Sequence, residues 1–209
     1  MHKYFLKIPW WIRVLYPDYL WKVQVPDKTV FLTFDDGPHP TITPWVLQQL
    51  KQYNATATFF CIGKNVVQFP DVYAQIIAAG HAVGNHTFSH LNGWKTPDEI
   101  YLADAIKAAD VIDSPLFRPP YGRIKKGQAR KLSIMLEKYN VKIVMWDVLS
   151  ADFDTSFSPK ACINTVLRHT RPGSVIVFDD SEKAFGNLQV ALPTILKELH
   201  SKGFDFQRL

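Results

Sequence analysis

Short apolar runs alternate with amphipathic segments along most of the chain. Runs of apolar, aromatic or β-branched residues predict buried strands at 29–34, 57–61, 81–84, 115–118, 141–146 and 174–178, with another at 204–207. Apolar residues with helical spacing predict helices at 41–52, 64–79, 97–113, 127–139, 159–169 and 188–200. We expect the second helix to break at Pro70 and the third to begin with Thr96 as its N-cap. Such alternation is typical of a parallel sheet with helices outside it.

The length of the chain favours an incomplete α/β barrel. A full eight-fold barrel needs about 250 residues, and this chain has 209. An open doubly wound sheet is the alternative, but no Gly-rich phosphate loop follows any predicted strand. We expect residues 28–209 to form one domain and residues 1–27, an aromatic-rich extension, to pack on it. The alternative for the extension is a membrane-surface anchor, because Lys and Arg residues flank its aromatic side chains.

Composition excludes several classes of protein. With 47% hydrophobic and 21% charged residues, the chain resembles an ordinary globular protein. Its formal charge of +5 is dispersed, which argues against nucleic acid as a partner. No apolar stretch is long enough to span a membrane. Cys61 and Cys162 are too few for a disulfide framework and are expected in the core. The N-terminus does not resemble a signal peptide, which favours the cytoplasm, with the periplasm or cell envelope as the alternative.

The first candidate site is a pair of adjacent acids. Asp35 and Asp36 follow the predicted strand 29–34 and precede Gly37 and Pro38, which favour a turn. Both acids should therefore lie at the carboxyl end of a buried strand, where α/β barrels carry their catalytic residues. Two adjacent carboxylates are tolerated if a cation lies between them or if one stays protonated. A solvated turn is the alternative.

A histidine pair follows the third predicted strand. His86 and His90 should lie at the same end of the sheet as Asp35 and Asp36, and they can reach one ion if their segment makes a helical turn. Two imidazoles and one carboxylate leave coordination positions open, as a catalytic zinc site requires. An iron oxygenase triad is an alternative, but a second Asp and an Arg-Pro-Pro turn are not expected beside such a triad.

A third motif, Phe117-Arg118-Pro119-Pro120-Tyr121-Gly122, ends the fourth predicted strand. Arg118 can keep a carboxylate ionised through a bidentate pair. The two prolines stiffen the turn, which could direct a backbone N–H toward a developing oxyanion. An arginine-capped turn without catalytic function is the alternative.

Together, the motifs Thr-Phe-Asp-Asp-Gly, His-Thr-Phe-Ser-His and Arg-Pro-Pro-Tyr resemble those of the polysaccharide deacetylase family, the NodB-like members of carbohydrate esterase family 4. The resemblance covers residues 28–207 and implies a distorted (β/α) barrel of about seven parallel strands. It implies a divalent metal, usually Zn²⁺ with Co²⁺ or Ni²⁺ also possible, held by Asp36, His86 and His90. Asp35 would be the base that deprotonates the metal-bound water.

The same resemblance implies the remaining roles. Arg118 would hold Asp35, and the Tyr121 N–H would stabilise the oxyanion. The substrate contacts that the resemblance implies are Pro120, Tyr121, Val175 and Val177; the two valines would line an acetyl-methyl pocket, with ordinary core packing as the alternative. Apart from the resemblance, Trp94 lies just past the histidine pair and is expected to stack on a sugar ring, with a loop that packs over the barrel as the alternative. The implied activity is hydrolytic deacetylation of an N- or O-acetylated carbohydrate by a monomeric enzyme.

The chain departs from the family pattern near its C-terminus. The family has a His as general acid where this chain has Asp179. An ordinary Asp is ionised at neutral pH and cannot donate a proton unless burial or neighbouring carboxylates raise its pKa. Leu149 and Phe153 replace an Asp and a Trp, whereas Asp152 remains and would orient Arg118 or the acid. If Asp179 cannot donate, Asp35 acts as both base and acid, or activity is weak. The alternative is a catalytically impaired protein that binds metal and carbohydrate.

Overall fold

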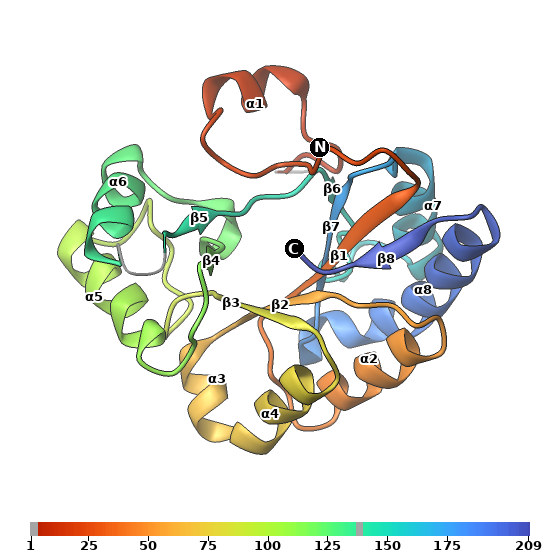
Figure 1. The fold of residues 1–209 in the computed structure, drawn as a ribbon, viewed down its shortest axis with the longest axis horizontal. Helices are drawn as coiled ribbons and strands as arrows, with labels where there is room; N and C mark the ends of the chain where they lie inside the picture. The colour runs from red at the N-terminus through yellow and green to blue at the C-terminus, as the bar shows by residue number, and fades with distance from the viewer. Residues whose placement is uncertain (1–3, 137–139) are drawn as a thin grey trace.

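A computed structural model of the chain describes residues 4–136 and 140–209, and it contains one parallel sheet (Figure 1). The sheet has the order β5-β4-β3-β2-β1-β7-β6, and β8 pairs with the beginning of β1. All pairs between named strands are parallel; the strands are β1 (Thr29–Asp35), β2 (Thr58–Cys61), β3 (Ala82–Asn85), β4 (Leu116–Phe117), β5 (Lys142–Ile143), β6 (Val148–Leu149), β7 (Val175–Asp179) and β8 (Asp205–Gln207). The sheet curls into an open half-barrel, which confirms the predicted fold class.

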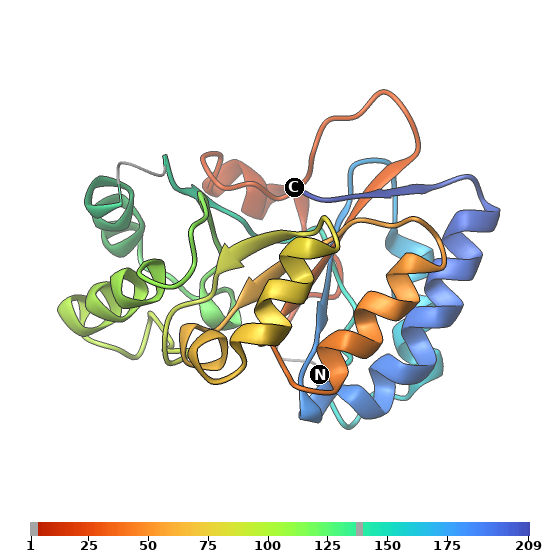
Figure 2. The same cartoon turned by 60° about the horizontal axis from the view of Figure 1, so that its bottom comes forward.

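Helices cover the outside of the curl (Figures 1 and 2). They are α2 (Ile42–Lys51), α3 (Gly63–Gln68), α4 (Pro70–Ala78), α5 (Asp98–Ala109), α6 (Lys126–Met135), α7 (Pro159–His169) and α8 (Glu182–Ser201). A further helix, α1 (Trp10–Leu15), projects apart from them (Figure 1), and a 3₁₀ turn, η1, lies at Pro120–Gly122. The expected break at Pro70 is confirmed, since α3 ends before this residue and α4 begins with it. Within the described chain, no helix is both long and apolar enough to cross a membrane.

Three predicted elements differ from the structure. The strand expected at 141–146 is reduced to the two residues of β5, and a second two-residue strand, β6, follows beyond that range. Helix α5 begins after Pro97, so Thr96 is not its N-cap. Helix α8 begins at Glu182 and runs through Pro193, because its apolar stripe is buried along its length. The end of the helix predicted at 127–139 falls partly on residues 137–139, outside the described residues.

Successive side chains of β1 point to opposite faces of the sheet. Val30, Leu32 and Phe34 point outward into the core beneath the helices. The side chains between them point into the curl, because successive residues of a strand face opposite sides, and Asp35 is the last of these. Cys61 and Cys162 are buried and free, as expected of core residues. The acid at the end of β1 is therefore inside the half-barrel.

The N-terminal segment lies along the opening of the half-barrel. Lys7 pairs with Val148 of β6, whereas Leu20 pairs with Val144, just after β5. Trp21 is buried in the same apolar cluster as residues of α5 and α6. The segment thus connects the two ends of the curled sheet, which do not pair with each other among the described residues. The proposed boundary between residues 1–27 and 28–209 stays a prediction.

Candidate active site

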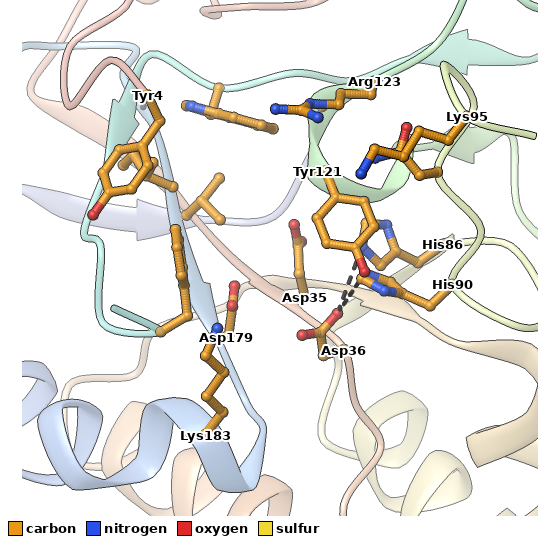
Figure 3. A pocket seen from close by; sticks show the side chains of 16 residues that line it. Tyr4, Asp35, Asp36, His86, His90, Lys95, Tyr121, Arg123, Asp179 and Lys183 are labelled. Carbon is orange, nitrogen blue, oxygen red and sulfur yellow. Dashed lines mark ion pairs between the residues drawn. The ribbon is translucent and has the colours of Figure 1, made fainter. Parts of the chain in front are cut away.

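The carboxyl ends of the strands surround a cavity of about 710 Å³. Figure 3 shows acids and histidines on its floor and several cations and aromatic rings around them. Its lining consists of Tyr4, Asp35, Asp36, His86, His90, Asn92, Lys95, Tyr121, Gly122, Arg123, Trp146, Leu149, Phe153, Val177, Asp179 and Lys183. The three motifs singled out in the sequence therefore meet in one cavity.

The two adjacent acids point in different directions. Asp35 ends β1 with its side chain inside the curl, whereas Asp36 has a φ of 78° and begins a turn. Gly37 N–H donates to Asp180 Oδ1 at 3.0 Å, which anchors this turn. A Cβ atom at Gly37 would lie 2.2 Å from Asp180 Oδ2, so the turn requires glycine. The solvated-turn alternative is wrong for Asp35, which is only 7% exposed.

Asp36, His86 and His90 form a candidate metal centre. Their potential ligand atoms all lie within 4.8 Å of one another. Asp36 Oδ1 is 3.1 Å from His90 Nε2 and 3.7 Å from His86 Nε2. The His86–His90 segment is not the helical turn considered from its spacing: Thr87 has a φ of 61° and His90 a φ of 58°. Left-handed backbone at these positions brings the second imidazole back toward the first.

The protonation states of these residues suit a metal. His86 Nδ1 lies 2.7 Å from the Arg118 carbonyl oxygen, which only accepts, so Nδ1 carries the hydrogen and Nε2 keeps its lone pair. Burial, reinforced by the neighbouring His90, lowers the pKa of His86 to about 3 and keeps it neutral. Burial opposes ionisation of Asp36, but its hydrogen bond with His90 and the nearby positive charges together outweigh this effect and lower the pKa of Asp36. Two imidazole nitrogens and a carboxylate fit a divalent ion such as Zn²⁺.

Arg118 is fully buried and contacts Asp35. Its Nη1 lies 2.7 Å from Asp35 Oδ1 and 2.7 Å from the Thr33 hydroxyl. Nε and Nη2 donate to the carbonyls of Val144 and Met145, so one nitrogen remains for Asp35 and the expected bidentate pair is wrong. Burial raises the pKa of Asp35 to about 6, although Arg118 opposes this rise.

Tyr121 lies at the edge of the cavity with a φ of 61°. Its side chain is exposed, and its ring centroid is 4.6 Å from that of His90. Within the part of the chain that the structure describes, its backbone N–H has no hydrogen-bond acceptor. This donor is therefore available beside the candidate metal centre.

Asp179 is the parallel-sheet neighbour of Asp35, so both carboxylates end adjacent strands on the inner face. Asp152 Oδ2 accepts the Asp179 N–H at 3.1 Å, and the Ser150 hydroxyl donates to Asp152 Oδ1 at 2.7 Å. Burial raises the pKa of Asp152 to about 7. Burial, followed by the charge of Asp36 and other nearby carboxylates, raises the pKa of Asp179 well above its ordinary value. Asp152 thus contacts Asp179, whereas no described bond joins it to Arg118.

The predicted substrate contacts are only partly brought together. Val177 and Tyr121 line the cavity. Val175 and Pro120 are buried beside it and do not line it; Val175 lies two residues deeper along β7. Trp94 is exposed outside the cavity, where its indole donates to the Ile124 carbonyl and its ring lies 5.2 Å from the Arg123 guanidinium.

Several lining residues were not predicted from sequence as site residues. Most lie on loops or on the N-terminal segment, whose position depends on long-range packing; they are Tyr4, Asn92, Lys95, Gly122, Arg123, Trp146, Leu149, Phe153 and Lys183. Proximity to the recognised motifs was the available signal for Gly122, Arg123 and Trp146. No local pattern marked Tyr4 or Lys183.

Comparisons with known proteins agree on one family. The "Polysaccharide deacetylase" family model matches residues 22–144. A peptidoglycan-N-acetylglucosamine deacetylase of Bacillus cereus is 38% identical over 86% of this chain and 66% of its own length. A chitooligosaccharide deacetylase of Azorhizobium caulinodans is 32% identical over 87% of this chain and 93% of its own length. The crystal structure of the Bc1960 peptidoglycan N-acetylglucosamine deacetylase superposes with a TM-score of 0.85 at 33% identity, covering 95% of this chain and 94% of that one.

Proposed function

Because the chain belongs to the polysaccharide deacetylase family, we propose that it is a metal-dependent hydrolase that removes the acetyl group from an N- or O-acetylated saccharide. The observation that carries this proposal is the placement of Asp35, Asp36, His86 and His90 in one cavity at the strand ends. All of these residues come from a single chain, so we expect a monomer to suffice.

Asp36, His86 and His90 would hold the metal. A divalent ion supplies Lewis-acid polarisation of the acetyl carbonyl and acidifies the attacking water when bound there. We propose Zn²⁺, with Co²⁺ or Ni²⁺ as substitutes, because the site offers two imidazoles and one carboxylate. The hydrogen bond between His86 Nδ1 and the Arg118 carbonyl orients the imidazole so that its Nε2 faces the metal position.

Asp35 is the proposed base. It takes a proton from the water that attacks the acetyl carbonyl, and Arg118 keeps its carboxylate ionised and oriented from 2.7 Å. The free Tyr121 N–H is the proposed donor to the oxyanion that forms as the carbonyl becomes tetrahedral. Val177 offers an apolar wall for the acetyl methyl group.

Asp179 is the proposed acid that protonates the leaving amine or alcohol. An Asp can donate a proton near neutral pH only if its pKa is raised, and burial and neighbouring carboxylates both raise the pKa of Asp179. Asp152 positions it through the Asp179 backbone N–H. If Asp179 stays ionised, Asp35 returns its own proton to the leaving group.

The rim of the cavity favours an anionic saccharide. Lys95, Arg123 and Lys183 line the cavity, and none has an ion-pair partner among the residues described (Figure 3). Three unpaired cations attract carboxylate groups in the substrate. We therefore propose that acetylated glycans bearing carboxylates, as in peptidoglycan, are preferred over neutral chitooligosaccharides.

Acetate release tests the function. The protein loaded with Zn²⁺ should release acetate from N-acetylglucosamine oligomers or peptidoglycan, and chelation should stop the release. Asp35→Asn should reduce the rate by at least roughly 10²-fold, since it removes the base. Asp113→Asn, an exposed acid outside the cavity, is the matched control. Full activity of Asp35→Asn would contradict the assignment of the base.

Asp179 also motivates a second candidate function, a protein that binds metal and carbohydrate without catalysis. Asp179→His distinguishes the two. A large gain in acetate release would identify a weakened enzyme, whereas a loss of activity would identify Asp179 as the acid in use. An inactive wild-type protein that still binds saccharide would favour the second function.

A further inference from the structure

Helix α1 has its polar and apolar sides reversed relative to an ordinary surface helix. A surface helix normally buries its apolar stripe and exposes its charges. In α1 no residue is buried, and the exposed fractions are 74% for Trp10, 46% for Trp11, 66% for Val14 and 55% for Leu15. Phe5, 51% exposed, lies against Trp11 with ring centroids 6.3 Å apart. We call these five side chains the apolar patch.

The charged residues of the same segment point inward. Arg13 Nη2 lies 2.5 Å from Asp147 Oδ1 and 3.3 Å from the Ile8 carbonyl oxygen. Lys7 Nζ lies 2.5 Å from the other carboxylate oxygen of Asp147, whose side chain is fully buried. Two ion pairs to one buried acid hold the segment against the half-barrel. The exposure of the apolar patch is therefore built into a fixed part of the fold.

The position of α1 leaves the patch free to meet a partner. The helix projects at the top of Figure 1, apart from the helices that cover the sheet. Ile8 and Trp21, on either side of it in the sequence, are buried in the cluster with α5 and α6. The aromatic residues of the N-terminal segment thus divide into an inner set that packs and an outer set that does not.

The size of the patch argues against a second copy of the chain. A six-residue helix is about 9 Å long. The face of so short a helix is smaller than the area of about 800 Å² that each partner buries in a stable dimer. A bilayer surface imposes no such minimum, because a few Trp and aliphatic side chains can insert individually into the headgroup region.

The charges around the patch suit an anionic surface. Lys7 and Arg13 share the single negative charge of Asp147, so these three groups together keep one net positive charge. The other charged residues from residue 4 to residue 22 are Asp18 and Lys22. Lys22 is exposed, and Lys126 Nζ lies 4.9 Å from the ring centroid of Tyr16, the residue after α1. Basic residues that flank exposed Trp side chains are typical of segments that bind anionic lipid.

We propose that the apolar patch inserts into the surface of a phospholipid bilayer that contains anionic lipids. The insertion holds the protein at the membrane through α1 without crossing it. It also places the bilayer near the cavity, because Tyr4, the residue before Phe5, lines that cavity. This binding is independent of the proposed catalytic function.

Flotation with lipid vesicles tests the proposal. The protein should float with vesicles of equal parts phosphatidylcholine and phosphatidylglycerol, less with phosphatidylcholine alone, and less again at high salt. Trp10→Ser combined with Trp11→Ser should weaken binding roughly tenfold or more, since two large apolar side chains are lost. The matched control is Val67→Ser with Ile77→Ser, two exposed apolar residues on α3 and α4.

Further readouts separate the outcomes. Val14→Ser with Leu15→Ser provides a second pair should the Trp variant fold poorly, and circular dichroism checks each variant. Acetate release from a soluble substrate should be unchanged in both pairs, so a failed deacetylase assay leaves the flotation result interpretable. No flotation, or equal flotation of the patch variants and the control, would overturn the proposal. Concentration-dependent self-association lost in the patch variants, without vesicle binding, would identify a second copy as the occupant.

Discussion

At the scale of single residues, Arg118 connects strands that are distant in the chain. Its guanidinium contacts Asp35 and Thr33 on β1 and the carbonyls of Val144 and Met145. Its Cζ lies 4.0 Å from the centroid of the Phe60 ring. A fully buried cation is stable only when its donors are used and its charge is balanced. One side chain therefore supports both the barrel interior and the ionisation of the proposed base.

Arg118→Met should uncouple these roles. Removing one partner of a buried ion pair costs about 3–5 kcal/mol of unfolding free energy, because Asp35 is left buried without a counter-charge. The pKa of Asp35 should rise further, and acetate release should fall at neutral pH. Urea unfolding and a pH–rate profile measure the two effects. Arg130→Met, at an exposed position on α6, is the control; an equal loss in both variants would argue against a special role for Arg118.

His81 should make stability fall in acid. Burial, with a smaller effect of Arg208, lowers the pKa of His81 from 6.5 to about 4. The unfolded chain therefore binds more protons than the folded chain between these values, and stability decreases as the pH falls from about 6.5 to about 4. The loss should reach about 3 kcal/mol, because each pH unit between the two pKa values contributes about 1.4 kcal/mol.

His81→Asn tests this pH dependence. Its amide oxygen can still accept the Ala57 N–H, which His81 Nδ1 accepts at 3.1 Å, but it cannot be protonated. Urea unfolding at several pH values should show a smaller decrease in the variant than in the wild type. His200→Asn, at an exposed position, should keep the wild-type pH dependence. An unchanged slope in His81→Asn would refute the assignment.

At the scale of elements, the turn after β1 is built by residues from three segments. Asp180, just after β7, accepts the Gly37 N–H and the Thr43 hydroxyl. The Ile62 N–H donates to the Gly37 carbonyl at 2.9 Å, and the Asn65 amide donates to the Asp36 carbonyl at 2.8 Å. The turn that orients Asp36 toward the histidines is therefore held from both neighbouring strands.

Gly37→Ala should disturb this turn. The new methyl group would meet the buried Asp180 carboxylate at 2.2 Å, which forces the turn or the acid to move. We expect a loss of about 1–3 kcal/mol in unfolding free energy and weaker metal binding, measured by urea unfolding and zinc titration. Gly186→Ala, within α8 and with no atom within 4 Å of the new methyl group, should be neutral or stabilising. Normal zinc affinity in Gly37→Ala would contradict this account.

At the scale of the whole molecule, the N-terminal segment completes a barrel that the sheet leaves open. It pairs with Val148, Val144 and Ser174, which lie at the two ends of the curl. It also contributes Tyr4 to the cavity and presents α1 outward. Asp147 is central to this arrangement, because both inward cations of the segment and the Ser174 hydroxyl, at 2.6 Å, contact its carboxylate.

Asp147→Asn should loosen the N-terminal segment. Loss of the buried charge leaves Lys7 and Arg13 without their counter-ion, which should cost about 3 kcal/mol of unfolding free energy. Limited proteolysis should then cut within residues 4–25 before the remaining chain unfolds. Glu182→Gln, whose ion pair with His39 is exposed, should behave like the wild type. Unchanged protease resistance in Asp147→Asn would show that other contacts hold the segment.

The sequence by itself determined the order of strands and helices and the three motifs of the site. Both depend on local information: the period of apolar residues indicates which face of an element is buried, and Asp-Asp-Gly-Pro marks the end of a strand. Since parallel strands end at one edge, Asp35, His86 and Arg118 could be assigned to the same site.

Only the tertiary structure decided how these residues meet. The short strands β5 and β6, the length of α8 and the path of residues 4–25 depend on packing between distant segments, which overrides local propensity. The same holds for the pairing of Asp179 with Asp35 and for the bond from His86 to the Arg118 carbonyl. Sheet register and burial set these contacts and their pKa values, and neither is encoded in any one stretch of the chain.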